Sequence, residues 1–89
     1  MRQVKTVEDV YPAIDELIVE LKTVGQSRLA TILHHRMHEV AWTARSELFE
    51  ELQVVFAKAV ETDVRNMPPL LREQIDLILL MVHNYLDSR

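Results

Sequence analysis

Apolar residues recur along this chain three and four positions apart in four separate segments. That spacing places them on one face of an α-helix, which has 3.6 residues per turn. We therefore predict helices at residues 9–24, 27–41, 44–61 and 68–87, which makes residues 1–89 a single all-α domain, a small four-helix bundle. The apolar faces of the first three helices are Val10, Ile14, Leu17, Ile18 and Leu21; Leu29, Ile32, Leu33, Met37 and Val40; and Leu48, Phe49, Leu52, Val55, Phe56, Ala59 and Val60.

Proline and glycine mark the boundaries of the first two helices. Pro12 is tolerated only in the opening turn, so Glu8 or Asp9 is the expected cap of the first helix. Gly25, the only glycine, stands where a helix often ends in a left-handed conformation. Ser27 is then the expected cap of the second helix.

The boundary between the second and third helices lacks such a marker. Residues 27–60 contain neither glycine nor proline. The apolar stripe nevertheless turns by about 90° between the two segments, which a single straight helix would not do. We therefore place a break near Trp42–Thr43. Pro68–Pro69 then opens the last helix.

The last helix has more apolar surface than one bundle can easily cover. An ordinary surface helix needs a stripe of little more than about 100°, whereas this arc covers about 200°. Leu80 lies outside even this arc, so the helix either is central in the bundle or meets a second copy of the chain. We favour self-association, with Leu77, Leu80 and Met81 at the contact. The residues of the arc are Leu70, Leu71, Ile75, Leu77, Ile78, Leu79, Met81, Val82, Tyr85 and Leu86.

Trp42, the only tryptophan, has two interpretations. Tryptophan is over-represented among the residues that contribute most to protein interfaces, which makes Trp42 a candidate interface residue. It could instead fill the corner between the second and third helices, and we favour this structural role.

A histidine-rich run offers a candidate metal site. His34 and His38 are four residues apart on a helix, a spacing that allows two imidazoles to share a metal ion. His35 and Glu39 form a second such pair. Neither the H-E-x-x-H pattern nor its inverted form is present, and the sequence identifies no third ligand. We favour a solvated polar face, and we expect no metal and no cofactor.

Acidic residues lie along the outer face of the third helix, at Glu47, Glu50, Glu51 and Glu61. Like charges four residues apart mildly destabilise a helix, which invites a functional explanation such as docking of a basic protein partner. An immunity protein or antitoxin would use such a surface. The alternative is an ordinary solvated face, which we favour.

The composition argues against several functions. Without cysteine there is neither a disulfide framework nor a thiolate metal site, and a single glycine cannot form a phosphate-binding loop. We therefore expect no enzyme. The net charge of −4 argues against nucleic-acid binding by general attraction, and Leu21 and Gln26 do not fit a helix-turn-helix. No apolar stretch suits a signal peptide or a membrane span, so we expect a cytoplasmic protein.

Two stretches resemble small uncharacterised bacterial all-helical proteins. The first comprises Glu16-Leu17-Ile18, Leu21, Gly25, Leu29-Ala30 and Leu33, and the second is Trp42-Thr43-Ala44-Arg45-Ser46-Glu47-Leu48. The resemblance implies a helical fold whose third helix begins in the second stretch. This chain lacks the glycine-rich turn that often precedes that helix in those proteins. The resemblance implies no activity, and our leading hypothesis is a non-enzymatic protein–protein interaction domain that forms a homodimer.

Overall fold

Four α-helices form where the hydrophobic pattern predicts them, and the part of the chain that the structure describes contains no strand. The computed structural model describes residues 4–63 and 67–88, without the side chains of 60–63. The all-α fold and the four-helix count are confirmed. The helices are α1 (Val10–Thr23), α2 (Ser27–His34), α3 (Arg45–Asp63) and α4 (Pro69–Asp87).

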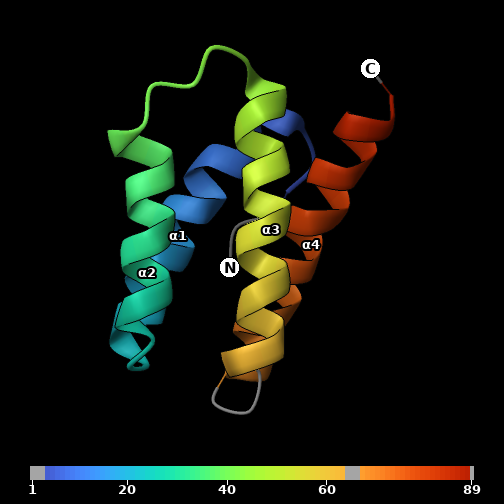
Figure 1. Cartoon of the computed structure of the whole chain (residues 1–89). Coiled ribbons are helices and arrows are strands. Elements are labelled where there is room, and N and C mark those ends of the chain that lie inside the picture. Colours follow the sequence, from blue (N-terminus) through green and yellow to red (C-terminus); the bar gives the residue numbers. More distant parts are fainter. Residues whose placement is uncertain (1–3, 64–66, 89) are drawn as a thin grey trace.

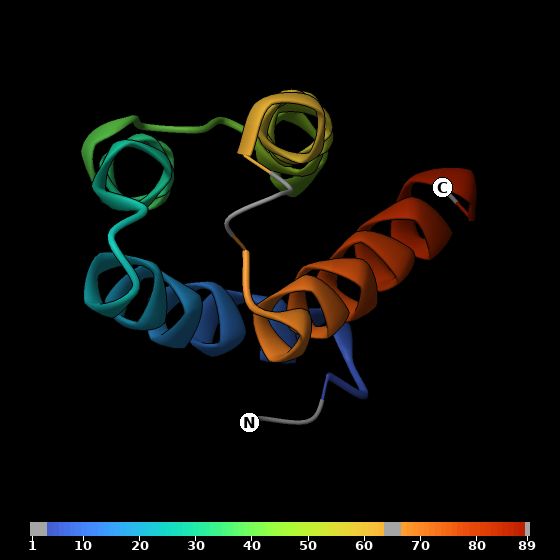
Figure 2. The same ribbon diagram turned by 90° about the horizontal axis from the view of Figure 1, so that it is seen from below.

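The helices form a bundle in which α4 lies at one edge. α1 packs against α2 and α4, and α3 packs against α4. Figure 1 shows α2 and α3 side by side and antiparallel, with α1 and α4 behind them. In Figure 2, α2 and α3 are seen nearly end on, whereas α1 and α4 run obliquely across the view. The C-terminal end of α4 therefore points away from α2.

The core consists of the faces that the 3.6-residue period selects. Phe49 and Phe56 of α3 are completely buried and are the largest fully buried side chains. Every predicted core residue of α1 is buried, as are those of α3 up to Ala59; Val60 lies outside the described side chains. In α2, Leu29 and Leu33 are buried and Ile32 is half-buried, as are Met37 of η2 and Val40 after it, the remaining core residues predicted for the second helix.

A short 3₁₀ helix, η1 (Val7–Asp9), precedes α1. Asp9 occupies the position before α1, as predicted, but its carboxylate does not cap that helix. It accepts hydrogen bonds from the backbone N–H groups of Lys5 and Thr6, both at 2.9 Å. Asp9 thus satisfies the free backbone donors at the start of η1 instead.

Gly25 ends α1 in the left-handed conformation that the sequence predicts, with φ of +85°. The backbone N–H of Gln26 donates to the carbonyl of Leu21 at 2.8 Å, which closes the turn after the helix. α2 begins at Ser27, so the capping position is Gln26. The prediction that Ser27 is the cap is therefore wrong by one residue.

The predicted break between the second and third helices is confirmed. α2 continues into a single π-helical turn, η2 (His35–Glu39), and Val40 then adopts an extended conformation. The helical path thus ends two residues before the predicted boundary at residue 41. α3 begins at Arg45, one residue after its predicted start.

Candidate functional site

The side of α4 that faces away from the core carries three exposed leucines. Leu70, Leu77 and Leu80 are 66%, 46% and 57% exposed. The opposite side of the helix is buried and consists of Leu71, Gln74, Ile75, Ile78 and Val82. α4 therefore has an apolar side in the core and a second partly apolar side that no described element covers.

This exposure argues against the interpretation that α4 is central in the bundle. α4 packs against α1, α3 and η1, yet Leu77 and Leu80 remain accessible to solvent. A helix surrounded by the rest of the bundle would have no such side, so α4 is not enclosed. Met81, the third predicted contact residue of α4, is half-buried and packs against the core.

An apolar groove lies between α1 and the first turns of α4. Its volume is about 540 Å³, and Glu16 and Glu20 are the charged residues that line it. Val19 and Leu70 are exposed on its walls, and Leu70 also belongs to the outer side of α4. The pattern of apolar residues gives no sign of this groove, because Val19 lies off the apolar face of α1. The remaining lining residues are Ala13, Leu17, Val24, Pro68, Leu71 and Gln74.

Arg45 connects α1, α3 and α4 at the C-terminal end of α4. Its Nε donates to the hydroxyl of Tyr11 at 2.9 Å, and its guanidinium carbon lies 5.6 Å and 5.8 Å from the ring centroids of Tyr11 and Tyr85. The hydrogen bond to Tyr11 is the main cause that raises the pKa of Arg45, and burial opposes it. Glu8 Oε1 lies 3.3 Å from Arg45 Nη2 and forms an ion pair with it. Phe49 contacts Tyr85 edge to face, with 5.1 Å between the ring centroids. These contacts join η1, α1, α3 and α4, and the sequence gives no local sign of them.

Trp42 occupies the corner between η2 and α3. Its indole N–H donates to the backbone carbonyl of Arg36 at 2.6 Å, and its side chain is partly buried against the core. The Arg36 carbonyl belongs to the last helical turn, where acceptors lack a partner within the helix. The geometry agrees with the structural role for Trp42.

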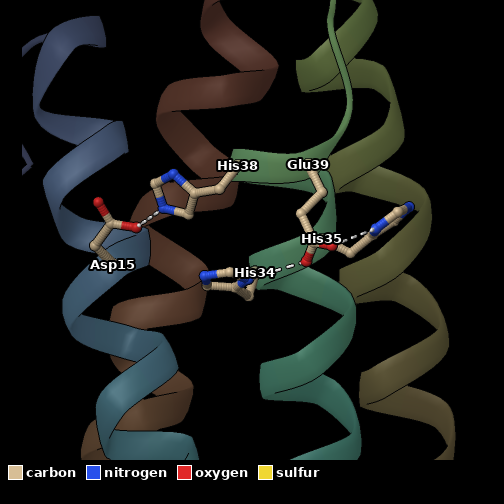
Figure 3. A network of polar contacts seen from close by, with 5 residues as sticks. All are labelled: Asp15, His34, His35, His38 and Glu39. Carbon is tan, nitrogen blue, oxygen red and sulfur yellow. Dashed lines mark hydrogen bonds and ion pairs between the residues drawn. The ribbon is translucent and has the colours of Figure 1, made fainter.

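The three histidines of the second helical segment are exposed and face carboxylates (Figure 3). His38 Nε2 lies 2.7 Å from Asp15 Oδ1 of α1, and His34 Nδ1 lies 3.2 Å from Glu39 Oε2. His35 Nδ1 lies 3.8 Å from the other oxygen of Glu39. A carboxylate only accepts hydrogen bonds, so the imidazoles of His34 and His38 donate in these contacts.

These contacts do not assemble a metal site. The rings of His34 and His38 are close, with centroids 5.0 Å apart, but each ring turns toward a different carboxylate. Across the described residues, no three histidine, aspartate or glutamate side chains come together as possible ligands. The contact between His38 and Asp15 links η2 to α1, which is a structural role.

The acidic residues of α3 have partners within the chain. Glu47 accepts a hydrogen bond from the Thr43 hydroxyl at 2.6 Å, and Glu51 accepts one from Arg36 Nε at 3.0 Å. Glu50 also takes part in an interaction, and the side chain of Glu61 lies outside the described ones. The contact with Arg36 pairs the Glu51 carboxylate with an opposite charge, whereas the Thr43 hydroxyl leaves the charge of Glu47 in place.

Comparison with protein-family models, with curated proteins and with solved structures finds no match to this chain. None of the described helices combines the length and apolarity needed to cross a membrane.

Proposed function

We propose that this protein is a non-enzymatic protein–protein interaction domain that forms a homodimer through the outer side of α4. The observation that carries this proposal is the exposure of Leu77 and Leu80, at 46% and 57%, one helical turn apart. Burying such surface against a second copy removes it from water, which is the main favourable contribution in protein association.

The surface around Leu77 and Leu80 supports the same location for the dimer contact. Leu70 lies on the same side of α4, two turns before Leu77, and it also lines the groove beside α1. Glu73 lies between Leu70 and Leu77 on this side, so the exposed leucines form an apolar surface with a charged interruption. Exposed apolar surface gathered on one side of a small domain is typical of an interaction site. Three leucines make a modest contact, so we expect a dissociation constant in the micromolar range.

The test is a charge introduced at the proposed contact. Leu80→Glu places a carboxylate in the apolar contact of both copies, and we expect the mass measured by light scattering to fall to the monomer value of 10.4 kDa. Helicity measured by circular dichroism should stay unchanged, because Leu80 is outside the core.

Val54→Glu is the matched control, since Val54 is a similarly exposed apolar residue, at 47%, on α3. This variant receives the same charge and should remain dimeric. A Leu80→Glu variant that keeps the dimer mass would contradict the proposed interface. Loss of the dimer in both variants would mean that added charge, rather than its position, causes dissociation.

A further inference from the structure

The exposed side of α4 forms a seam with the spacing of a coiled coil, and we infer that two copies pair along it in antiparallel directions. This inference rests on the proposed homodimer. Six exposed residues alternate at three and four positions, as the core positions of a heptad do. They are Leu70, Glu73, Leu77, Leu80, Asn84 and Asp87.

A parallel pairing in register would be unfavourable. It places every seam residue opposite its own copy, so Glu73 would face the partner's Glu73 and Asp87 the partner's Asp87. Both side chains are exposed carboxylates on the seam. Like charges held opposite each other in a contact destabilise it, and two of the six layers would be of this kind.

An antiparallel pairing about a two-fold axis near the middle of the seam removes both repulsions. Leu77 then packs against the partner's Leu80, and by symmetry Leu80 against the partner's Leu77. Glu73 faces the partner's Asn84, whose amide can donate a hydrogen bond to a carboxylate. Leu70 lies opposite the partner's Asp87, near the ends of the two helices. Leu77 and Leu80 form the centre of this contact, and no carboxylate faces another.

The residues beside the seam also favour the antiparallel pairing. On one flank Gln74 is buried and Met81 half-buried by their own bundle, so the partner reaches mainly the other flank. That flank carries Asp76 and His83, both exposed. In an antiparallel pair, corresponding flanks face each other, which brings Asp76 close to the partner's His83 on both sides of the axis.

His83 is available for such a contact. Its Nε2 lies 3.1 Å from Asp87 Oδ2 within the same helix, but the two side chains are 60% and 72% exposed. An exposed pair of this kind contributes little to stability, so exchanging it for a contact with the partner's Asp76 costs little. In a parallel pair, His83 would instead lie beside the partner's Ser88, which offers no carboxylate.

The test uses the absence of cysteine from the chain, which allows single thiols to be placed without background. Leu77→Cys and Leu80→Cys are prepared separately, one of them labelled with ¹⁵N, then mixed and oxidised in a glutathione redox buffer. Mass spectrometry distinguishes the mixed disulfide from the two self-disulfides. A disulfide needs Cα atoms within about 7 Å, which holds for residues directly opposite each other across the seam.

The antiparallel pairing predicts that the mixed disulfide forms in large excess over random pairing. An excess of the two self-disulfides indicates a parallel pair and overturns the inference. Random proportions with a wild-type protein of dimer mass overturn it too, because the seam is then not the contact. A wild-type protein of monomer mass instead contradicts the proposed function, so the two failures are distinguishable.

A charge exchange provides a second measurement that needs no oxidation. Asp76→Lys places a cation beside the partner's His83, and His83→Glu places an anion beside the partner's Asp76. Each variant alone should dimerise about three- to tenfold more weakly than the wild type. Mixing the two variants should restore association, because the new lysine then faces the new glutamate. Unchanged association on mixing contradicts the antiparallel direction.

Discussion

The indole N–H of Trp42 donates a hydrogen bond to the backbone carbonyl of Arg36, with 2.6 Å between nitrogen and oxygen. This contact closes the turn that follows η2, since the carbonyl belongs to a helical turn whose acceptors have no partner along the helix. The same residue was a candidate interface anchor on sequence grounds. Its hydrogen bond allows the two roles to be separated by experiment.

Trp42→Phe removes the N–H donor and keeps an aromatic side chain in the corner. We expect the free energy of unfolding to fall by about 1–2 kcal/mol, because a partly buried carbonyl loses its partner. The dimer mass should stay the same. Urea denaturation must be followed by circular dichroism, as the substitution removes the only tryptophan. A variant of unchanged stability that no longer dimerises would assign Trp42 to the interface instead.

Truncation of two neighbouring residues of α4 should affect two different properties, the stability of the fold and the strength of dimerisation. Ile78 is completely buried, whereas Leu77 is 46% exposed. Ile78→Ala leaves a cavity in the core and should lower the free energy of unfolding by about 2–5 kcal/mol. Leu77→Ala should lower it by less than about 1 kcal/mol, while weakening dimerisation.

Each variant thus serves as the control for the other. Stability is measured by urea denaturation at the lowest workable protein concentration, because dimerisation itself adds to stability at high concentration. Equal losses of stability in the two variants would contradict the division of α4 into a core side and an interface side.

Gly25 provides a test of backbone strain that involves no packing. Its φ is +85°, and a Cβ added there would meet no atom within 4 Å. Gly25→Ala should therefore destabilise the protein by about 1–2 kcal/mol through conformational strain alone. Gly25→Asn should cost less, since asparagine tolerates the left-handed conformation better than other residues. Thermal unfolding of the two variants checks this order, and equal midpoints would contradict it.

The histidine cluster should behave as a structural contact. We expect no saturable binding of zinc or nickel to untagged protein in calorimetry, because His34 and His38 turn toward different carboxylates. Asp15→Asn, which weakens the acceptor of His38, should lower thermal stability slightly. Stoichiometric binding that disappears in a variant with His34 and His38 both changed to alanine would establish a metal site.

Much of the fold follows from the period of apolar residues. The spacing of Leu17, Leu33 and Leu52 with their neighbours defines each buried face, because packing against a core requires a continuous stripe. The positive φ at Gly25 was also predictable, since only glycine adopts it freely. The spacing of apolar residues within one helix does not show how much of that helix its neighbours cover. Leu77 lies within the apolar arc of α4 and is nevertheless exposed.

Contacts between residues far apart in the sequence were not predictable. The hydrogen bond from Arg45 to Tyr11 joins residues 34 positions apart, and the groove joins Val19 to Leu70. Each of these residues is ordinary within its own helix, so no local pattern distinguishes it. The π-helical turn that precedes Val40 has no local marker either, although the indole of Trp42 donates a hydrogen bond to the carbonyl of Arg36 within it.

The proposed homodimer places a second copy of the chain over the outer side of α4. Its most direct test is the mass of the untagged wild-type protein, measured by light scattering after size exclusion over a range of micromolar concentrations. We predict a mass that rises with concentration toward twice 10.4 kDa. A constant mass of 10.4 kDa across the whole range would contradict the homodimer.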